Sequence, residues 1–258
     1  MFNFLKSNKK EPLDYERRKY FENNLLWLIQ EFPKPGIEDR QVICPTPENF
    51  PIQWNASEEN ANAACRIICE NMQLNHNEIE LDFYDNGMQE IDMGTSVIFM
   101  ENHPEDSIAA GLYHHERNEE GKYQVSIDQA LLEAPDNLIA TLAHELVHVK
   151  LLGEKKLDFN DEMLTDFATV FFGLGIFNAN TAFQFHSGYD RWGYKSMGYL
   201  SIEEWAYALA LFAFIRHEDN PLWSKHLAKP VLNEFNKSMD YMLKNEGEIF
   251  NFNEQTKS

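Results

Sequence analysis

Residues 137–152 read NLIATLAHELVHVKLL, and this stretch decides how the rest of the chain is interpreted. Its apolar residues recur at the three- to four-residue spacing of a buried helix; they are Leu138, Ile139, Leu142, Leu146, Val149 and Leu152. Asp136 stands before the stretch as an N-cap, and Gly153 follows it as a stop signal. The pattern therefore predicts a helix over residues 137–152.

Within this helix, His144-Glu145-Leu146-Val147-His148 places two imidazoles four residues apart. Residues at that spacing lie on one helical face, where two imidazoles can bind the same ion. Glu145 is next to the first histidine, so its carboxylate can take a proton from a metal-bound water. The alternative is a pair of ordinary helix histidines whose hydrogen bonds are satisfied by neighbouring protein groups.

A catalytic zinc site takes three protein ligands and leaves one position open, so two histidines are too few. Residues 153–159 form a short loop, and the next helix, over residues 160–173, is expected to run back antiparallel to the first. A chain folded about Lys155 brings Glu162 opposite His148 and Asp166 opposite His144. Glu162 is therefore the expected third ligand, and Asp166 the residue that orients the ring of His144.

Other acidic residues compete for these roles, because the chain is rich in them. Asp158 and Asp161 are close enough in sequence to replace Glu162 as a ligand. Glu162 and Asp166 could also both face solvent. The sequence leaves these alternatives open.

In this combination the chain resembles the gluzincin group of zinc metallopeptidases, which carry HExxH followed by ExxxD. Here these motifs are HELVH and Glu162-Met163-Leu164-Thr165-Asp166. The resemblance implies that one zinc ion is bound by His144, His148 and Glu162, with Glu145 as general base and Asp166 supporting the first histidine. It also implies an edge strand along which peptide substrate lies antiparallel, and residues 123–128 are well placed for that strand.

The resemblance covers about residues 108–173. Thirteen residues separate His148 from Glu162, which is fewer than is usual in thermolysin-like members. The motifs therefore indicate the group and no named family within it.

The remaining chain predicts an α+β fold with a small mixed or antiparallel sheet and a helical C-terminal half, as one domain over residues 1–258, and the resemblance implies that this fold is zincin-like. Residues 1–12 are expected to be disordered. Helical spacing marks residues 15–32, 57–72 and 201–216, and a last helix is expected over 222–245. Strands are expected at 78–84 and 95–100, with a hairpin formed by 108–114 and 123–128. Residues 42–52 form an extended connection, and residues 183–200 a loop.

A formal net charge of −20 argues against nucleic acid or an anionic membrane as a partner, because both would be repelled. Three cysteines without a paired framework, Cys44, Cys65 and Cys69, indicate reduced thiols in a cytoplasmic protein. Cys65 and Cys69 are expected in the core. The N-terminal order of apolar and basic residues is not that of a signal peptide, and the longest apolar run is too short for a membrane helix.

Zincin active sites also use a donor that stabilises the oxyanion. The expected loop offers five candidates, among which the sequence does not choose: His186, Tyr189, Arg191, Tyr194 and Tyr199. His114 and His115 adjoin the expected edge strand and are either substrate contacts or surface histidines.

The expected function is a zinc-dependent peptidase acting on a peptide or protein substrate. The alternative is a zincin scaffold that binds peptides or regulates without hydrolysis. Oligomeric state is not indicated by the sequence.

Overall fold

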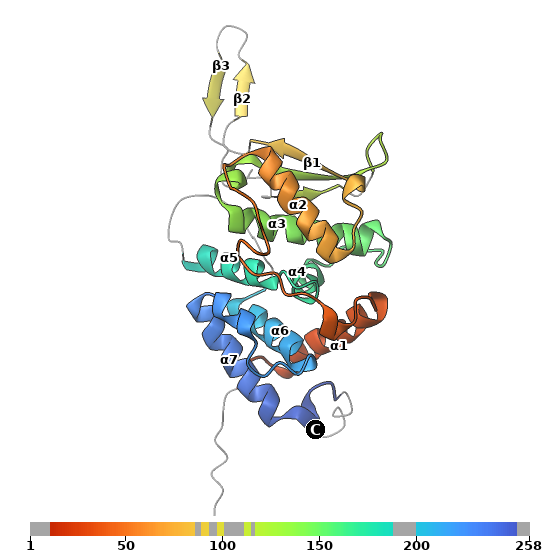
Figure 1. The fold of residues 1–258 in the computed structure, drawn as a ribbon, viewed down its shortest axis with the longest axis vertical. Helices are drawn as coiled ribbons and strands as arrows, with labels where there is room; N and C mark the ends of the chain where they lie inside the picture. The colour runs from red at the N-terminus through yellow and green to blue at the C-terminus, as the bar shows by residue number, and fades with distance from the viewer. Residues whose placement is uncertain are drawn as a thin grey trace, which may run out of the picture.

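Helix α3 (Pro135–His148) is packed between a small sheet on one side and a group of helices on the other (Figure 1). The computed structural model of the chain describes residues 11–85, 89–92, 97–100, 111–114, 117–187 and 200–251; for 89–92, 97–100 and 184–187 it describes the backbone alone. Ten of the fourteen residues of α3 are buried, so the helix is covered on nearly every face. The fold is α+β.

The sheet that flanks α3 has three strands in the order β1 (Ile79–Tyr84), β5 (Tyr123–Asp128) and β4 (Gly111–Tyr113). β1 and β5 are parallel and β4 and β5 antiparallel, so the sheet is mixed. The expected hairpin is present between β4 and β5. The expectation that residues 123–128 form an edge strand is wrong, because β1 pairs with their other side. Within the described chain, β4 is the edge beside α3.

A second pair of strands, β2 (Gln89–Asp92) and β3 (Val97–Met100), is antiparallel and extends away from the other elements (Figure 1). The sequence indicated only the second of these two strands. Residues 86–88, 93–96 and 101–110 lie outside the described part of the chain.

Three helices begin where the sequence pattern predicts. α1 (Tyr15–Glu31) is capped by the Asp14 carboxylate, and α2 (Glu58–Met72) by the hydroxyl of Ser57. α6 (Ile202–Ile215) begins with a complete capping box in which Ser201 and Glu204 satisfy each other's backbone N–H groups. Cys65 and Cys69 lie buried on α2, as expected, and all three cysteines are free thiols.

The helix expected over residues 137–152 differs from the structure in two respects. α3 begins at Pro135, so Asp136 lies inside the first turn and makes no cap. α3 also ends at His148, where a π-helical turn (Val149–Gly153) widens the helix before the chain reverses. A proline fits the first turn of a helix because its missing N–H would have no partner there.

The segment after α4 (Glu162–Phe171) is more helical than its glycines suggest. α5 (Gly175–Ser187) includes residues 183–187, which were expected in a loop. The expected last helix is divided into a 3₁₀ turn (Leu222–His226) and α7 (Lys229–Lys244), with Pro230 in the first turn of α7. Residues 1–10, 115–116, 188–199 and 252–258, with the expectations that fall on them, lie outside the described residues.

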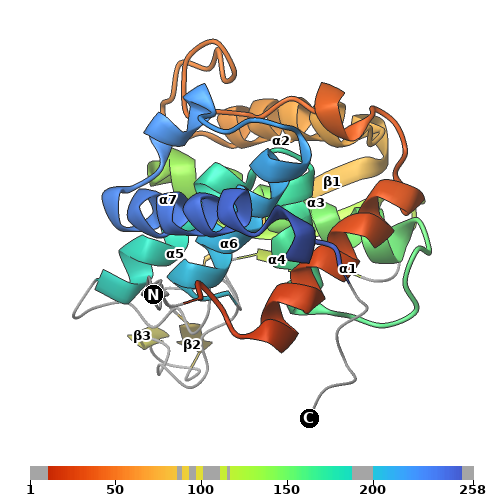
Figure 2. The same ribbon diagram turned by 90° about the horizontal axis from the view of Figure 1, so that it is seen from below.

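Two layers of helices fill the remainder of the molecule. α4 and α5 lie against α3, and α6, α7 and α1 cover them from below (Figures 1 and 2). Phe167 and Phe171 of α4 contact aromatic rings of α1 and of the residue that follows it, Phe21 and Phe32. None of the described helices combines the length and apolarity that a bilayer crossing requires.

Candidate metal centre

The two histidines of α3 lie side by side at its C-terminal end. Their Nε2 atoms are 3.2 Å apart, as one turn of helix separates the residues. The ring of Tyr113, on β4, is stacked on the ring of His148 at an interplanar angle of 14°. The two imidazoles therefore point toward a common position between α3 and α4.

Glu162, the first residue of α4, supplies a third donor to this position. Its Oε2 lies 3.1 Å from Nε2 of His144 and 3.4 Å from Nε2 of His148. Its other oxygen accepts a hydrogen bond from the Asn160 amide at 2.7 Å. Asn160 therefore fixes the rotation of the carboxylate and leaves Oε2 turned toward the imidazoles.

The competing carboxylates are used elsewhere or lie outside this group. Asp161 caps α4 by accepting from Leu164 N–H at 3.0 Å. Asp158 is exposed and is absent from the cluster of donors that could hold a metal ion. Among the described residues, that cluster consists of His144, His148 and Glu162.

A second set of hydrogen bonds fixes which nitrogen of each ring carries the proton. Nδ1 of His144 lies 2.9 Å from the buried carboxylate of Asp166. Nδ1 of His148 lies 3.4 Å from Oγ1 of Thr165, whose own hydrogen is donated to the Asp161 carbonyl. Each Nδ1 is thus the donor, and in the neutral rings each Nε2 offers its lone pair to the same point.

The three donor atoms fit a tetrahedral ion. Zinc bonds of about 2.0–2.1 Å to nitrogen and oxygen place tetrahedral ligand atoms about 3.3–3.4 Å apart. The observed separations are 3.1, 3.2 and 3.4 Å. The side chains of His144 and Glu162 are 18% and 26% exposed, so the remaining position opens toward solvent.

Glu145 is the acidic residue closest in sequence to these ligands, and it is only 6% exposed. Burial raises the pKa of Glu145, and the charge of Glu162 adds to that effect. The cationic forms of His144 and His148 and a hydrogen bond from the Tyr113 backbone act in the opposite direction. A carboxylate with a raised pKa beside a metal position can both accept and return a proton near neutral pH.

The electrostatics of the ligands follow from the same contacts. Burial acts to lower the pKa of His144, but the hydrogen bonds to Asp166 and Glu162 outweigh it and hold that pKa well above its usual value. Hydrogen bonds from His144 and His148 hold the pKa of Glu162 well below its usual range. Without a metal ion, the cluster is thus a protonated imidazole paired with carboxylates.

The edge strand β4 crosses α3 at Glu145. A Cβ added at Gly111 would lie 2.5 Å from Cγ2 of Thr141 and 3.0 Å from Oε1 of Glu145, so a side chain there would displace one of them. Glycine is therefore the residue that lets the strand approach the helix this closely.

The backbone N–H and C=O groups of Gly111 and Tyr113 turn away from β5. The hydrogen bond that His114 N–H donates to the Gln124 carbonyl fixes this pattern, because hydrogen-bonded pairs alternate along an antiparallel ladder.

The structure places the five residues expected at the site within one group, and it adds three that the sequence did not single out. Asn160 fixes the rotation of the Glu162 carboxylate, and the hydroxyl of Thr165 accepts a hydrogen bond from His148. The lack of a side chain at Gly111 lets β4 approach α3. For Asn160 alone there was a sequence signal, since polar residues close before a helix often contact its first turn, and Asn160 directly precedes the N-cap Asp161.

The oxyanion candidates receive no support from the described residues. Tyr189, Arg191, Tyr194 and Tyr199 lie outside them, and His186 is in α5 without a described side chain. His114 does not reach the metal position but bonds Oγ of Ser126 at 2.8 Å.

The chain was also compared with known proteins. It matches no protein-family model, no curated protein and no solved structure. The conclusions about function therefore depend on the geometry of this site.

Proposed function

We propose that this protein is a zinc-dependent peptidase of the gluzincin kind, with a zincin-like fold. The observation that carries the proposal is the set of three donor atoms, two imidazole nitrogens and one carboxylate oxygen, at the mutual distances of tetrahedral zinc ligands. Three protein ligands with one open position is the ligand count of catalytic zinc sites, whereas structural sites are closed by four.

In this proposal His144, His148 and Glu162 hold one zinc ion. When bound, the ion supplies Lewis acidity, which polarises a carbonyl group and lowers the pKa of water. Glu145 accepts the proton of the attacking water on its carboxylate and passes it to the amine that leaves. Asp166 and Thr165 hold the two rings in the tautomer that offers Nε2.

The peptide substrate is proposed to lie along β4. The outward-facing backbone groups of Gly111 can pair with an extended chain by strand addition. This replaces the expectation that residues 123–128 would do so, because both sides of β5 are already paired.

Replacing Glu145 by Gln tests the proposal, since the amide cannot accept a proton but keeps the shape of the side chain. We expect E145Q to retain about one zinc per chain and to lose peptidase activity by roughly 10²–10⁴-fold. Activity is measured as cleavage of a diverse peptide library, read by mass spectrometry. Glu38→Gln, which changes an exposed acidic residue by the same chemistry, is expected to leave both readouts unchanged.

Two results decide between the enzyme and its alternative. Zinc binding with peptide cleavage that depends on Glu145 supports the peptidase. Zinc binding and peptide binding without any cleavage by the unaltered protein would instead identify a peptide-binding module built on the same scaffold.

A further inference from the structure

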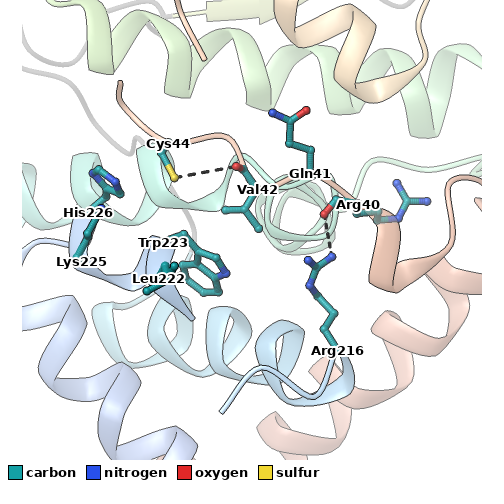
Figure 3. A pocket seen from close by; sticks show the side chains of 9 residues that line it. All are labelled: Arg40, Gln41, Val42, Cys44, Arg216, Leu222, Trp223, Lys225 and His226. Atoms are coloured by element: carbon teal, nitrogen blue, oxygen red, sulfur yellow. Dashed lines mark hydrogen bonds between the residues drawn. The ribbon is translucent and has the colours of Figure 1, made fainter. Parts of the chain in front are cut away.

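A hollow lies away from the metal centre, between the connection that follows α1 and the end of α6. Its volume is about 380 Å³, and it is open to solvent. Figure 3 shows Lys225 and His226 at one end, Arg216 at the other, and Trp223 and Leu222 between them. Four of its nine lining residues are basic or histidine, and none is acidic, although acidic residues outnumber basic ones 42 to 22 in the chain.

Positive charge at this place is only partly compensated. Arg40 is 4% exposed; its Nη2 donates to the Phe32 carbonyl, and its buried Nε has no hydrogen-bond partner. The guanidinium lies 3.8 Å from the ring centre of Phe171, turned away from Trp223 in Figure 3. Burial, and then the charge of Arg216, lower the pKa of Arg40 to about 10. The positive charges of the Arg40 and Arg216 guanidinium groups therefore repel each other.

Arg216 shares a single carboxylate with Trp223. Its Nε and Nη2 donate to Oε1 of Glu218, and the Trp223 indole donates to Oε2 of the same residue at 2.9 Å. Its Nη1 donates to the backbone carbonyls of Ile37 and Arg40. Through Glu218, the Trp223 indole is thus connected to the positive charge of Arg216 at one end of the hollow.

At the opposite end, two donors remain available. In the described chain, the ammonium of Lys225 and the ring of His226 make no hydrogen bond or ion pair. Leu222 beside them is 86% exposed, an uncommon degree for a large apolar side chain bordering a cavity. An ammonium group and an imidazole N–H donor next to exposed apolar surface suit a ligand that has an anionic head and an apolar body.

We propose that this hollow binds a small organic anion. Its carboxylate or phosphate group accepts hydrogen bonds from Lys225 and His226, and its apolar body covers Trp223 and Leu222. Such a ligand would supply the negative charge that Lys225 lacks, since the one carboxylate that contacts the basic side chains of the hollow in the described chain, Glu218, is bound to Arg216 at the other end. Recognition rests on local charge, because a chain with net charge −20 repels anions elsewhere on its surface.

The test uses the full chain labelled with ¹⁵N and follows the indole N–H resonance of Trp223, assigned with Trp223→Phe. Four probes are titrated at constant ionic strength: inorganic phosphate, phenyl phosphate, benzoate and the neutral analogue benzamide. We expect a saturable shift with phenyl phosphate, benzoate or both, and which of them binds more tightly identifies the head group. Inorganic phosphate, which lacks an apolar body, is expected to bind at least about tenfold more weakly than phenyl phosphate.

Lys225→Ala is expected to weaken binding about tenfold, because it removes a charged hydrogen-bond donor. Lys237→Ala changes the net charge equally at an exposed position of α7 and is expected to leave binding within about twofold. The proposal is overturned if no anionic probe shifts the indole saturably, if benzamide binds as tightly as the tighter of phenyl phosphate and benzoate, or if the two lysine variants weaken binding alike.

Discussion

At the scale of single residues, the Nδ1 protons of the two imidazoles, which do not face the metal position, determine how the rings are oriented. The Nδ1–H groups of His144 and His148 are each held by an oxygen of α4, from Asp166 and Thr165. Both Nε2 atoms then face Glu162. Without these two acceptors, the rings could rotate or exchange tautomers, and the three donor atoms would no longer converge.

The protonation of His144 sets how the metal-free protein responds to pH. Its folded-state pKa is raised above the unfolded value of about 6.5, because the hydrogen bonds to Asp166 and Glu162 outweigh burial. The stability that this ion pair contributes is therefore complete below about pH 6.5 and is lost as pH rises through the folded pKa. A zinc ion must displace the extra proton from His144, so zinc binding becomes stronger as pH rises.

Zinc should accordingly stabilise the protein more at higher pH. We expect the rise in Tm produced by excess zinc to grow between about pH 6 and about pH 8, because binding at the lower pH must also remove a proton from His144. The measurement is thermal unfolding with zinc or with a chelator, in buffers that do not bind metals.

Asp166→Asn provides the matched variant, because it keeps a hydrogen-bond acceptor but removes the charge that raises the pKa of His144. Its pH dependence is expected to be displaced to lower pH, and its zinc affinity to be about 10- to 100-fold weaker. A zinc-induced change in Tm that is the same at every pH in both proteins would contradict this account of His144.

At the scale of elements, the separation between β4 and α3 determines where Glu145 lies. The strand approaches the helix so closely that Gly111 has no room for a Cβ. The same strand carries Tyr113, whose ring stacks on His148 and whose backbone bonds the Glu145 carboxylate. One short strand therefore positions both a ligand and the proposed base.

Gly111→Ala is expected to lower kcat/KM by roughly tenfold or more, because the added methyl group displaces Thr141 or Glu145. Zinc affinity is expected to stay within about threefold, since none of the ligands contacts that methyl group. Gly247→Ala, where an added Cβ meets nothing within 4 Å, is the control, and should leave kcat/KM unchanged. Equal activity in the two variants would show that the approach of β4 does not position Glu145.

The elements also show which features a sequence can predict. The antiparallel return of α4 follows from a short loop, so the meeting of Glu162 and Asp166 with the histidines could be predicted. The central position of β5 could not, because it depends on a parallel pairing with β1, which is distant in sequence and is specified by no local turn. The end of α5 was missed because residues 183–187 were grouped with the glycine- and aromatic-rich sequence that follows them, whereas in the structure they continue the helix.

At the scale of the whole molecule, the N-terminal helix supports α4, the second helix of the candidate metal centre. Tyr20 of α1 lies 3.4 Å from the Asp161 carboxylate that caps α4. Glu22, fully buried on the same helix, accepts hydrogen bonds from Lys19, from Tyr207 of α6 and from the backbone of Phe250. α1 therefore ties the start of α4 to the C-terminal part of the described chain.

These long-range contacts were beyond prediction from the sequence. The amphipathic pattern of residues 15–32 predicts a helix with a buried face, but Lys19 and Glu22 would be assigned to its solvent-facing side. They are buried because each finds partners that come much later in the chain: Lys19 donates to the Glu248 carbonyl, 229 residues away, and Glu22 accepts from Tyr207, 185 residues away. Composition and charge predicted none of this pairing.

The central claim is that His144, His148 and Glu162 bind one zinc ion, and X-ray absorption at the zinc edge of the loaded protein tests it most directly. We predict about one zinc per chain, coordinated by nitrogen and oxygen alone at about 2.0–2.1 Å with two imidazoles, and loss of the ion in His144→Ala and Glu162→Ala. Zinc bound by sulfur at about 2.3 Å, or fully retained in both variants, would contradict the claim.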